Sequence, residues 1–138
     1  MRLVGSTAPD FTIRDSDRTV NLRDLRGKIV VLNFWAAHCG PCIEEMPSLV
    51  ELQKQMGSRI VVLGVGVDTT DADYHSFLRD YKIGFLTVRD ADKSSYLLYG
   101  ATGYPETTII DSSGTIRRKF IGPQNWTSPE IIGYLNKL

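Results

Sequence analysis

The two cysteines of this 138-residue chain, Cys39 and Cys42, stand three positions apart in the segment Trp-Ala-Ala-His-Cys-Gly-Pro-Cys. In the first turn of a helix, residues i and i+3 lie about 5 to 6 Å apart, and a disulfide needs its Cα atoms within about 4.4 to 6.8 Å. The pair can therefore open and close with little backbone movement. This spacing predicts a redox-active pair, since a bridge that closes so short a loop would stabilise the fold little as a structural disulfide.

The position of the pair predicts different roles for the two thiols. Cys39 directly precedes a helical pattern, and the free N–H groups and partial positive charge of a helix N-terminus can lower a thiol pKa to about 3.5 to 7.5. Gly40 leaves room for a partner's backbone, and Pro41 suits a first helical turn. We expect Cys39 to be the exposed nucleophile and Cys42, inside the helix, to be the buried resolving thiol.

Length and composition limit the possible functions. At 138 residues, 42% hydrophobic and 23% charged, with a formal net charge of zero, the sequence predicts one globular domain over residues 1–138. No basic footprint supports nucleic acid as a partner, and nothing implies a cofactor. Because neither a transmembrane run nor a signal-peptide core is present, the chain is expected to be either cytoplasmic or a mature or trimmed form.

Strands and helices are expected to alternate around the cysteines. Nearly continuous apolar runs, typical of strands buried on both faces, alternate with helical spacing. The predicted strands are 18–22, 29–35, 60–67, 86–89, 107–111 and 115–121. The predicted helices are 41–56, 71–81, 93–99 and 129–138. These elements form a βαβ unit followed by a ββα unit, an α/β fold with helices on both faces of one mixed sheet and an N-terminal β extension.

Six motifs follow one another along the chain in a recognisable order. They are Gly5–Phe11 (GSTAPDF), Leu25–Lys28 (LRGK), Asn33–Ala36 (NFWA), Cys39–Cys42 (CGPC), Glu45–Pro47 (EMP) and Gly103–Asp111 (GYPETTIID). With them the chain resembles thioredoxin-fold proteins of the TlpA, ResA and DsbE (CcmG) group, from about Gly5 to its C-terminus.

This resemblance implies a thiol-disulfide oxidoreductase that acts on protein disulfides or dithiols, as a reductant more than an oxidant. Apocytochrome c is among the implied substrates, and an upstream thiol reductant is an implied partner. The resemblance also implies an extracytoplasmic, periplasmic location in the bacterial envelope, with the cytoplasm as the alternative. We expect the chain to act as a monomer.

The resemblance assigns Pro105 as a cis-proline opposite the cysteines. A cis X-Pro bond usually holds a particular turn, and it would leave the Tyr104 backbone free to pair with an extended peptide by strand addition. A trans proline before an edge strand is the alternative. Trp35 is expected to serve both as core and as a wall of the active site.

Acidic residues near the cysteines depart from the classical pattern. Thioredoxins carry a buried Asp six residues before the first cysteine, but this chain has Asn33, which cannot exchange a proton at neutral pH. Asp68, at the end of the predicted strand 60–67, lies about where ResA-like proteins carry an active-site acid, so the resemblance makes it a candidate for proton transfer, with a helix-initiating role as the alternative. Glu106, after Pro105, is a candidate for a partner-facing or tuning role. Glu44 and Glu45 are expected to be solvated acids of the first helical turn.

His38 stands where the family commonly has an aromatic or hydroxyl residue. As an imidazolium it would favour the Cys39 thiolate and make the reactivity of that thiolate sensitive to pH near neutrality. The alternative is an exposed side chain at the rim that contacts partners.

Three other functions remain as alternatives. A peroxiredoxin shares the opening Ala-Pro-Asp-Phe, but its Pro-x-x-x-Thr/Ser-x-x-Cys pattern would require Thr or Ser at position 39. A metal-binding module or copper chaperone would need more soft ligands than Cys39, Cys42 and either His38 or His75 supply, so no metal site is predicted. A purely structural interaction domain would tolerate the loss of Cys39.

Overall fold

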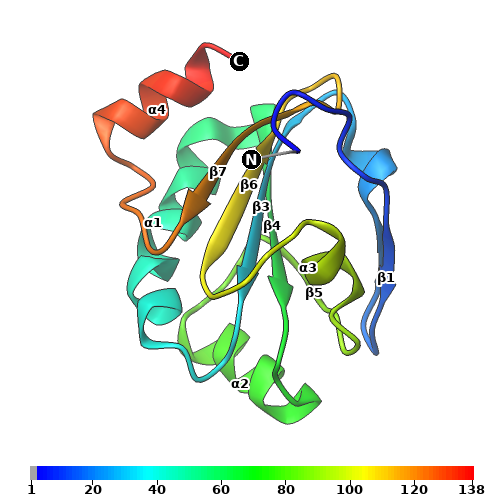
Figure 1. Ribbon diagram of the computed structural model, residues 1–138. Coiled ribbons are helices and arrows are strands. Elements are labelled where there is room, and N and C mark those ends of the chain that lie inside the picture. Colours follow the sequence, from blue (N-terminus) through cyan, green and yellow to red (C-terminus); the bar gives the residue numbers. More distant parts are fainter. Residues whose placement is uncertain (1–2) are drawn as a thin grey trace.

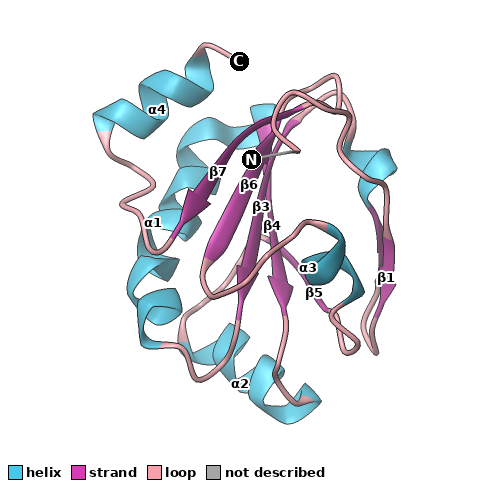
Figure 2. Ribbon diagram, in the orientation of Figure 1, coloured by secondary structure: helices cyan, strands magenta, loops and turns pink. Residues whose placement is uncertain are grey.

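A five-stranded mixed sheet forms the centre of the computed structural model, which describes residues 3–138 (Figures 1 and 2). The strands lie in the order β5-β4-β3-β6-β7. Their bounds are β3 (Ile29–Trp35), β4 (Ile60–Gly66), β5 (Leu86–Arg89), β6 (Glu106–Ile110) and β7 (Ile116–Ile121). β3 pairs in parallel with β4 and antiparallel with β6, so the βαβ and ββα units share one sheet as predicted.

Both faces of the sheet are covered. One face carries α1 (Gly40–Met56), α2 (Asp71–Asp80) and α4 (Pro129–Asn136). The other carries α3 (Ser94–Leu98) and a hairpin of β1 (Thr12–Arg14) and β2 (Thr19–Asn21). Figure 1 shows α1 and α4 on one side of the sheet and β1 on the other. Two short 3-10 helices, η1 (Leu22–Leu25) and η2 (Gly57–Arg59), complete the fold.

The central strand β3 explains why the fold has two hydrophobic cores. All seven of its residues are buried, and successive side chains point to opposite faces. Val31 and Trp35 join the core under α1, α2 and α4, whereas Leu32 and Phe34 join the core under α3 and the hairpin. The continuous apolar run in the sequence therefore reflects a strand that has no solvent-facing side.

The active-site helix α1 begins and ends as its sequence predicts. Cys39 is its N-cap residue and Pro41 lies in its first turn, where a missing N–H costs nothing. Gly57 ends it with φ of 57°, a left-handed conformation that glycine adopts without a steric penalty. None of the helices in residues 3–138 is long and apolar enough to cross a membrane.

The predicted boundaries hold to within about two residues. The strands at 29–35 and 86–89 have the predicted bounds. The strand predicted at 18–22 is shorter because Leu22 begins η1, and the helix predicted at 93–99 is flanked by Lys93 and Tyr99 as cap residues.

Candidate active site

The cysteine pair lies between the end of β3 and the start of α1, and it forms a disulfide with Cα atoms 5.2 Å apart. The Cys39 Sγ also accepts a hydrogen bond from the Cys42 backbone N–H at 3.2 Å, so Cys39 caps the helix with its sulfur. Cys39 is partly exposed, whereas Cys42 is completely buried. The predicted difference in exposure between the two thiols is confirmed.

The two spacer residues leave the disulfide open to a partner. Gly40 and Pro41 are both exposed, and a Cβ at Gly40 would have no neighbour within 4 Å. A partner backbone could therefore approach Cys39 from this side. Their predicted roles in substrate binding agree with this exposure but remain predictions.

Trp35 lies in the core directly before the active-site loop. Its indole stacks on Phe77 with ring centroids 4.1 Å apart and on Tyr74 at 5.6 Å. It is 1% exposed and belongs to the same core cluster as Cys42. Its predicted packing role is confirmed, while a wall facing the substrate remains a prediction.

The Tyr104–Pro105 peptide bond is cis, as the resemblance implied. The Tyr104 hydroxyl donates a hydrogen bond to Asp68 Oδ2 at 2.5 Å, and its ring lies 5.1 Å from that of Tyr96. These contacts fix the Tyr104 side chain, so the backbone before Pro105 is held at a defined place.

Asp68 is held by charge rather than poised for proton transfer. Lys93 Nζ lies 2.8 Å from its Oδ2. The Lys93 ammonium and then the Tyr104 hydroxyl lower the pKa of the Asp68 carboxyl below its usual value. Asp68 therefore remains ionised near neutral pH, and these contacts do not favour the proton-transfer role that the sequence suggested.

His38 contacts the next helix of the chain. Its Nε2 lies 2.9 Å from Asp73 Oδ2 in the first turn of α2, and 81% of its side chain is exposed. The imidazole therefore joins the active-site loop to α2, and its effect on the Cys39 thiolate remains a prediction.

Glu106 is buried, which argues against the partner-facing role that the sequence suggested and leaves its tuning role a prediction. It is 2% exposed, because it occupies the first position of β6 in the central sheet. Its Oε2 accepts hydrogen bonds from the backbone N–H groups of Thr102 at 2.8 Å and Gly103 at 3.0 Å. Its Oε1 lies 2.7 Å from Lys119 Nζ. Glu106 thus organises the loop that leads to Pro105 from within.

The sequence-based prediction is wrong for Glu45, which is buried rather than solvated. Its Oε1 accepts a hydrogen bond from the amide of Asn33 at 2.7 Å, and its Oε2 accepts from Trp126 Nε1 and from the Gln124 backbone N–H, each at 3.0 Å. Burial raises the pKa of the Glu45 carboxyl above its usual value, and these hydrogen bonds offset only part of that effect.

The buried carboxylate lies close to both the resolving cysteine and Asn33. Glu45 is three residues after Cys42, on the same face of α1, where Cβ atoms are about 5 to 6 Å apart. Asn33, six residues before Cys39, donates to both Glu45 and Thr107. A buried carboxyl group from α1 thus lies next to Asn33.

A groove of about 300 Å³ lies beside the start of α1. Its lining residues include Glu44, Glu45, Ser48 and Gln124. The buried residue Glu45 therefore adjoins a groove at the protein surface.

The sequence contains a signal that could have identified Glu45. Glu45, Leu49 and Leu52 recur at the spacing of one helix face, and both leucines are completely buried. Glu44 lies outside this stripe and is exposed. The contact with Trp126 joins residues 81 positions apart, so no local pattern could predict it.

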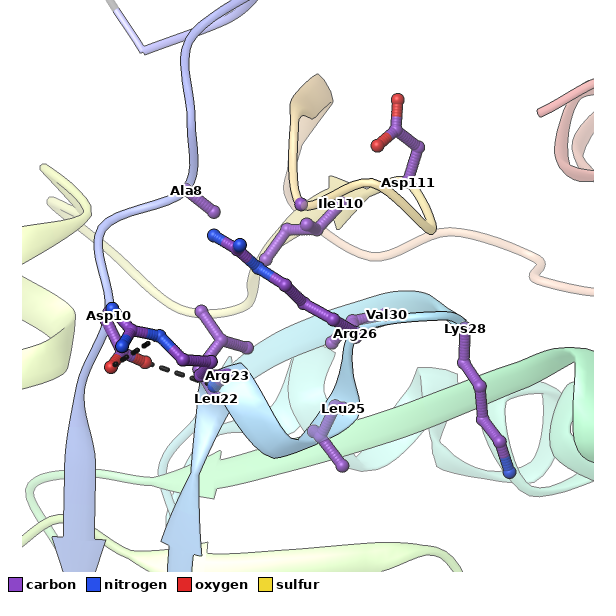
Figure 3. A pocket seen from close by; sticks show the side chains of 11 residues that line it. Ala8, Asp10, Leu22, Arg23, Leu25, Arg26, Lys28, Val30, Ile110 and Asp111 are labelled. Atoms are coloured by element: carbon purple, nitrogen blue, oxygen red, sulfur yellow. Dashed lines mark hydrogen bonds and ion pairs between the residues drawn. The ribbon is translucent and has the colours of Figure 1, made fainter.

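A second pocket lies at the opposite end of β3 from the cysteines (Figure 3). Val30 and Ile110 line it, and Arg23 forms an ion pair with Asp10 at its edge. Its volume of about 20 Å³ is room for about one water molecule, so it is not a substrate site. No group of three or more His, Cys, Asp or Glu side chains within residues 3–138 is placed to hold a metal ion.

Comparison with known proteins agrees with this geometry. The model of the AhpC/TSA family matches residues 4–119. The thiol-disulfide oxidoreductase ResA of Bacillus thuringiensis (strain Al Hakam) is 34% identical, over 98% of this chain and 78% of the relative. The chain belongs to the AhpC/TSA family, among its thiol-disulfide oxidoreductases.

Solved structures support the same assignment. A DsbE-type thiol:disulfide interchange protein of Chlorobium tepidum superposes with a TM-score of 0.85 at 29% identity, over 97% of this chain and 93% of that chain. A secreted Mycobacterium tuberculosis disulfide oxidoreductase homologous to E. coli DsbE superposes with a TM-score of 0.81 at 25% identity, over 93% of this chain and 96% of that chain. The thioredoxin fold and the assignment of the chain to thiol-disulfide exchange are thereby confirmed.

Proposed function

We propose that this protein reduces disulfides of protein substrates in the bacterial envelope, with Glu45 as the group that moves the proton of Cys42. The observation that carries the proposal is the unequal placement of the cysteines, since Cys39 is accessible and Cys42 is buried beside a carboxyl of raised pKa. An accessible nucleophile can attack a large substrate. A buried resolving thiol needs an internal base.

The reaction proceeds in two exchanges. The Cys39 thiolate attacks one sulfur of the substrate disulfide, that bond breaks, and the other substrate sulfur leaves as a thiolate. Glu45 then accepts the Cys42 proton, and the Cys42 thiolate attacks Cys39 Sγ. The mixed disulfide breaks, the second substrate thiol is released, and the Cys39–Cys42 disulfide remains. Two electrons pass to the substrate, and an upstream thiol reductant must return them.

The substrate proposal follows the relatives. The similarity to ResA and to a DsbE-type protein supports apocytochrome c as the substrate. The disulfide to be reduced would lie in its Cys-x-x-Cys-His motif, the site of c-type haem attachment. The secreted relative supports a location outside the cytoplasm. An oxidised peptide with this motif is therefore the appropriate probe, together with an unrelated oxidised peptide for comparison.

The reduction potential of the cysteine pair tests whether the protein reduces or oxidises its substrates. We expect equilibration with glutathione to give a Cys39–Cys42 potential more negative than about −200 mV, the side of thioredoxin rather than of the oxidant DsbA at about −120 mV. The reduced protein should then reduce the Cys-x-x-Cys-His peptide, and Cys39→Ser should abolish the reaction. A potential near that of DsbA would overturn the reductase proposal, and rapid turnover of hydrogen peroxide would favour a peroxidase instead.

A further inference from the structure

Lys119 is a largely buried lysine in a strand whose neighbouring basic residues face solvent. Only 9% of its side chain is exposed, although Arg117 and Arg118 on the same strand are exposed. A solvated basic face would be the simplest arrangement for Arg117, Arg118 and Lys119, and Lys119 departs from it. A lysine is rarely buried unless its charge is paired, so the Lys119 ammonium should have a partner in the structure.

The ammonium of Lys119 joins two segments. Nζ lies 2.7 Å from Glu106 Oε1 and donates a hydrogen bond to the Gly100 carbonyl at 3.3 Å. Lys119 pairs with Thr108 in the β6–β7 register, so it reaches Glu106 diagonally, two residues along β6. One end of this contact is thus anchored in the central sheet.

The other end is the segment from Gly100 to Pro105, which we call the Pro105 loop. Glu106 Oε2 accepts hydrogen bonds from the Thr102 and Gly103 N–H groups, and the Thr102 hydroxyl lies 3.4 Å away. Together, Lys119 and Glu106 bind three residues of this loop, Gly100, Thr102 and Gly103, none of which is part of a strand or helix. The loop leads directly to Tyr104, whose backbone is the expected pairing site for an extended substrate.

Stability alone does not account for this arrangement. A buried ion pair is often no more stabilising than well-packed apolar residues of similar volume. A carboxylate can accept several backbone N–H groups at once, which an apolar side chain cannot. Because the Lys119 ammonium compensates the buried negative charge of Glu106, the Glu106 carboxylate can remain charged and accept the hydrogen bonds from the loop.

We infer that Lys119 is a positioning residue for substrate binding: through Glu106 it holds the Pro105 loop where the Tyr104 backbone can pair with an extended peptide disulfide. This inference rests on the proposed function. Lys119 has no chemical part in the exchange, so its loss should weaken the binding of peptide substrates and leave the reactivity of Cys39 intact.

The test compares two disulfides. One is an extended peptide disulfide, and the other is a small aromatic disulfide that lacks peptide groups and cannot pair with the Tyr104 backbone. We expect Lys119→Met to raise KM for the peptide about tenfold with kcat little changed, and to alter the rate with the small disulfide less than about twofold. Lys119→Arg should restore much of the peptide KM, and Arg117→Met, on the same strand, is the matched control.

The outcomes separate the inference from a general structural effect and from the proposed function. Equal losses with both disulfides, or no loss with either, would overturn the inference. If Lys119→Met fails to fold, the double variant Lys119→Met/Glu106→Gln carries the same test, because it leaves no unpaired buried charge. Its neutral amide oxygen accepts the Thr102 and Gly103 N–H groups more weakly than a carboxylate does, so the peptide KM should still rise. A wild-type protein that reacts only with the small disulfide would instead overturn the proposed function.

Discussion

At the scale of single residues, the site contains two pairs of like residues in which one member is buried and the other is exposed to solvent. Cys39 and Cys42 are one helical turn apart, yet only Cys39 reaches solvent. Glu44 and Glu45 are adjacent, yet only Glu45 is buried with a raised pKa. In both pairs the buried member faces the interior under α1. The chemistry of the site is therefore divided between an accessible nucleophile and an internal resolving pair.

The first prediction concerns the order of the two thiols. Cys42→Ser should accumulate a mixed disulfide between Cys39 and an oxidised peptide, because the attack on the substrate is retained and the resolving thiol is absent. Mass spectrometry of the unreduced protein would detect this adduct. Cys39→Ser is the control, and an equal yield of adduct through Cys42 would contradict the assigned order.

The second prediction concerns proton transfer by Glu45. Glu45→Gln should slow resolution of the mixed disulfide by about 10²-fold, the lower range for the loss of a general base. The amide can keep the hydrogen bonds from Trp126 and Gln124, and its NH₂ can donate to Asn33 Oδ1, which has no hydrogen-bond partner among the residues described. The protein should therefore fold.

Stopped-flow measurement over a range of pH would check this. In the wild type the rate should rise with pH as the raised pKa of Glu45 is passed and its carboxylate becomes available as a base. Glu45→Gln should lose this rise, whereas Glu44→Gln, which changes the exposed neighbour, should keep it. Identical profiles for the two variants would exclude Glu45 as the base.

At the scale of elements, the first turns of α2 connect the active-site loop to the N-terminal hairpin. His38 reaches Asp73 from one side, and His75 Nε2 lies 2.7 Å from Asp17 Oδ2 in the turn between β1 and β2. The hydrogen bond to Asp17 is the main cause that raises the pKa of His75. The hairpin is thus attached by a contact that depends on protonation.

The third prediction follows from the sign of this shift. A histidine whose pKa is raised by folding stabilises the protein fully below its unfolded pKa of about 6.5, and this contribution is lost as pH rises through the folded pKa. His75→Gln should therefore lose stability at pH 5.5 and differ little from wild type at pH 9. Because a third of the side chain is exposed, the effect should stay below about 1 kcal/mol.

Thermal unfolding at the two pH values would measure this. Asp17→Asn removes the main partner and should reduce the same pH dependence, of which Asp71 supplies the remainder. A stability loss in His75→Gln that is equal at pH 5.5 and pH 9 would contradict the assignment to the ion pair.

The elements also explain how far the sequence could predict the fold. A nearly continuous apolar run predicted β3 with its bounds, because a strand buried on both faces has few polar residues. The strand β1 has three residues and only Ile13 buried, which gives no recognisable alternation. The burial of Glu45 and of Lys119 could not be predicted from local sequence, because it depends on partners distant in the chain, Trp126 for the first and Glu106 for the second.

At the scale of the whole molecule, the active site lies where the two cores approach each other. Tyr104 packs against both hydrophobic clusters, whereas Cys42 belongs to the one under α1. The substrate-binding loop is thus supported by both faces of the sheet, and the cysteines by one.

The last prediction links the redox state to the stability of the entire domain. Folding and reduction form a thermodynamic cycle, so a disulfide that makes the folded protein a strong reductant must also stabilise the fold, by about 1.4 kcal/mol for each 30 mV below the potential of the unfolded chain. The oxidised protein should consequently unfold at a higher urea concentration than the reduced protein. Circular dichroism with and without dithiothreitol would measure both midpoints, and the double variant Cys39→Ser/Cys42→Ser should show no response to dithiothreitol. A reduced form more stable than the oxidised form is the behaviour of an oxidant such as DsbA, and it would reverse the proposed direction of electron flow.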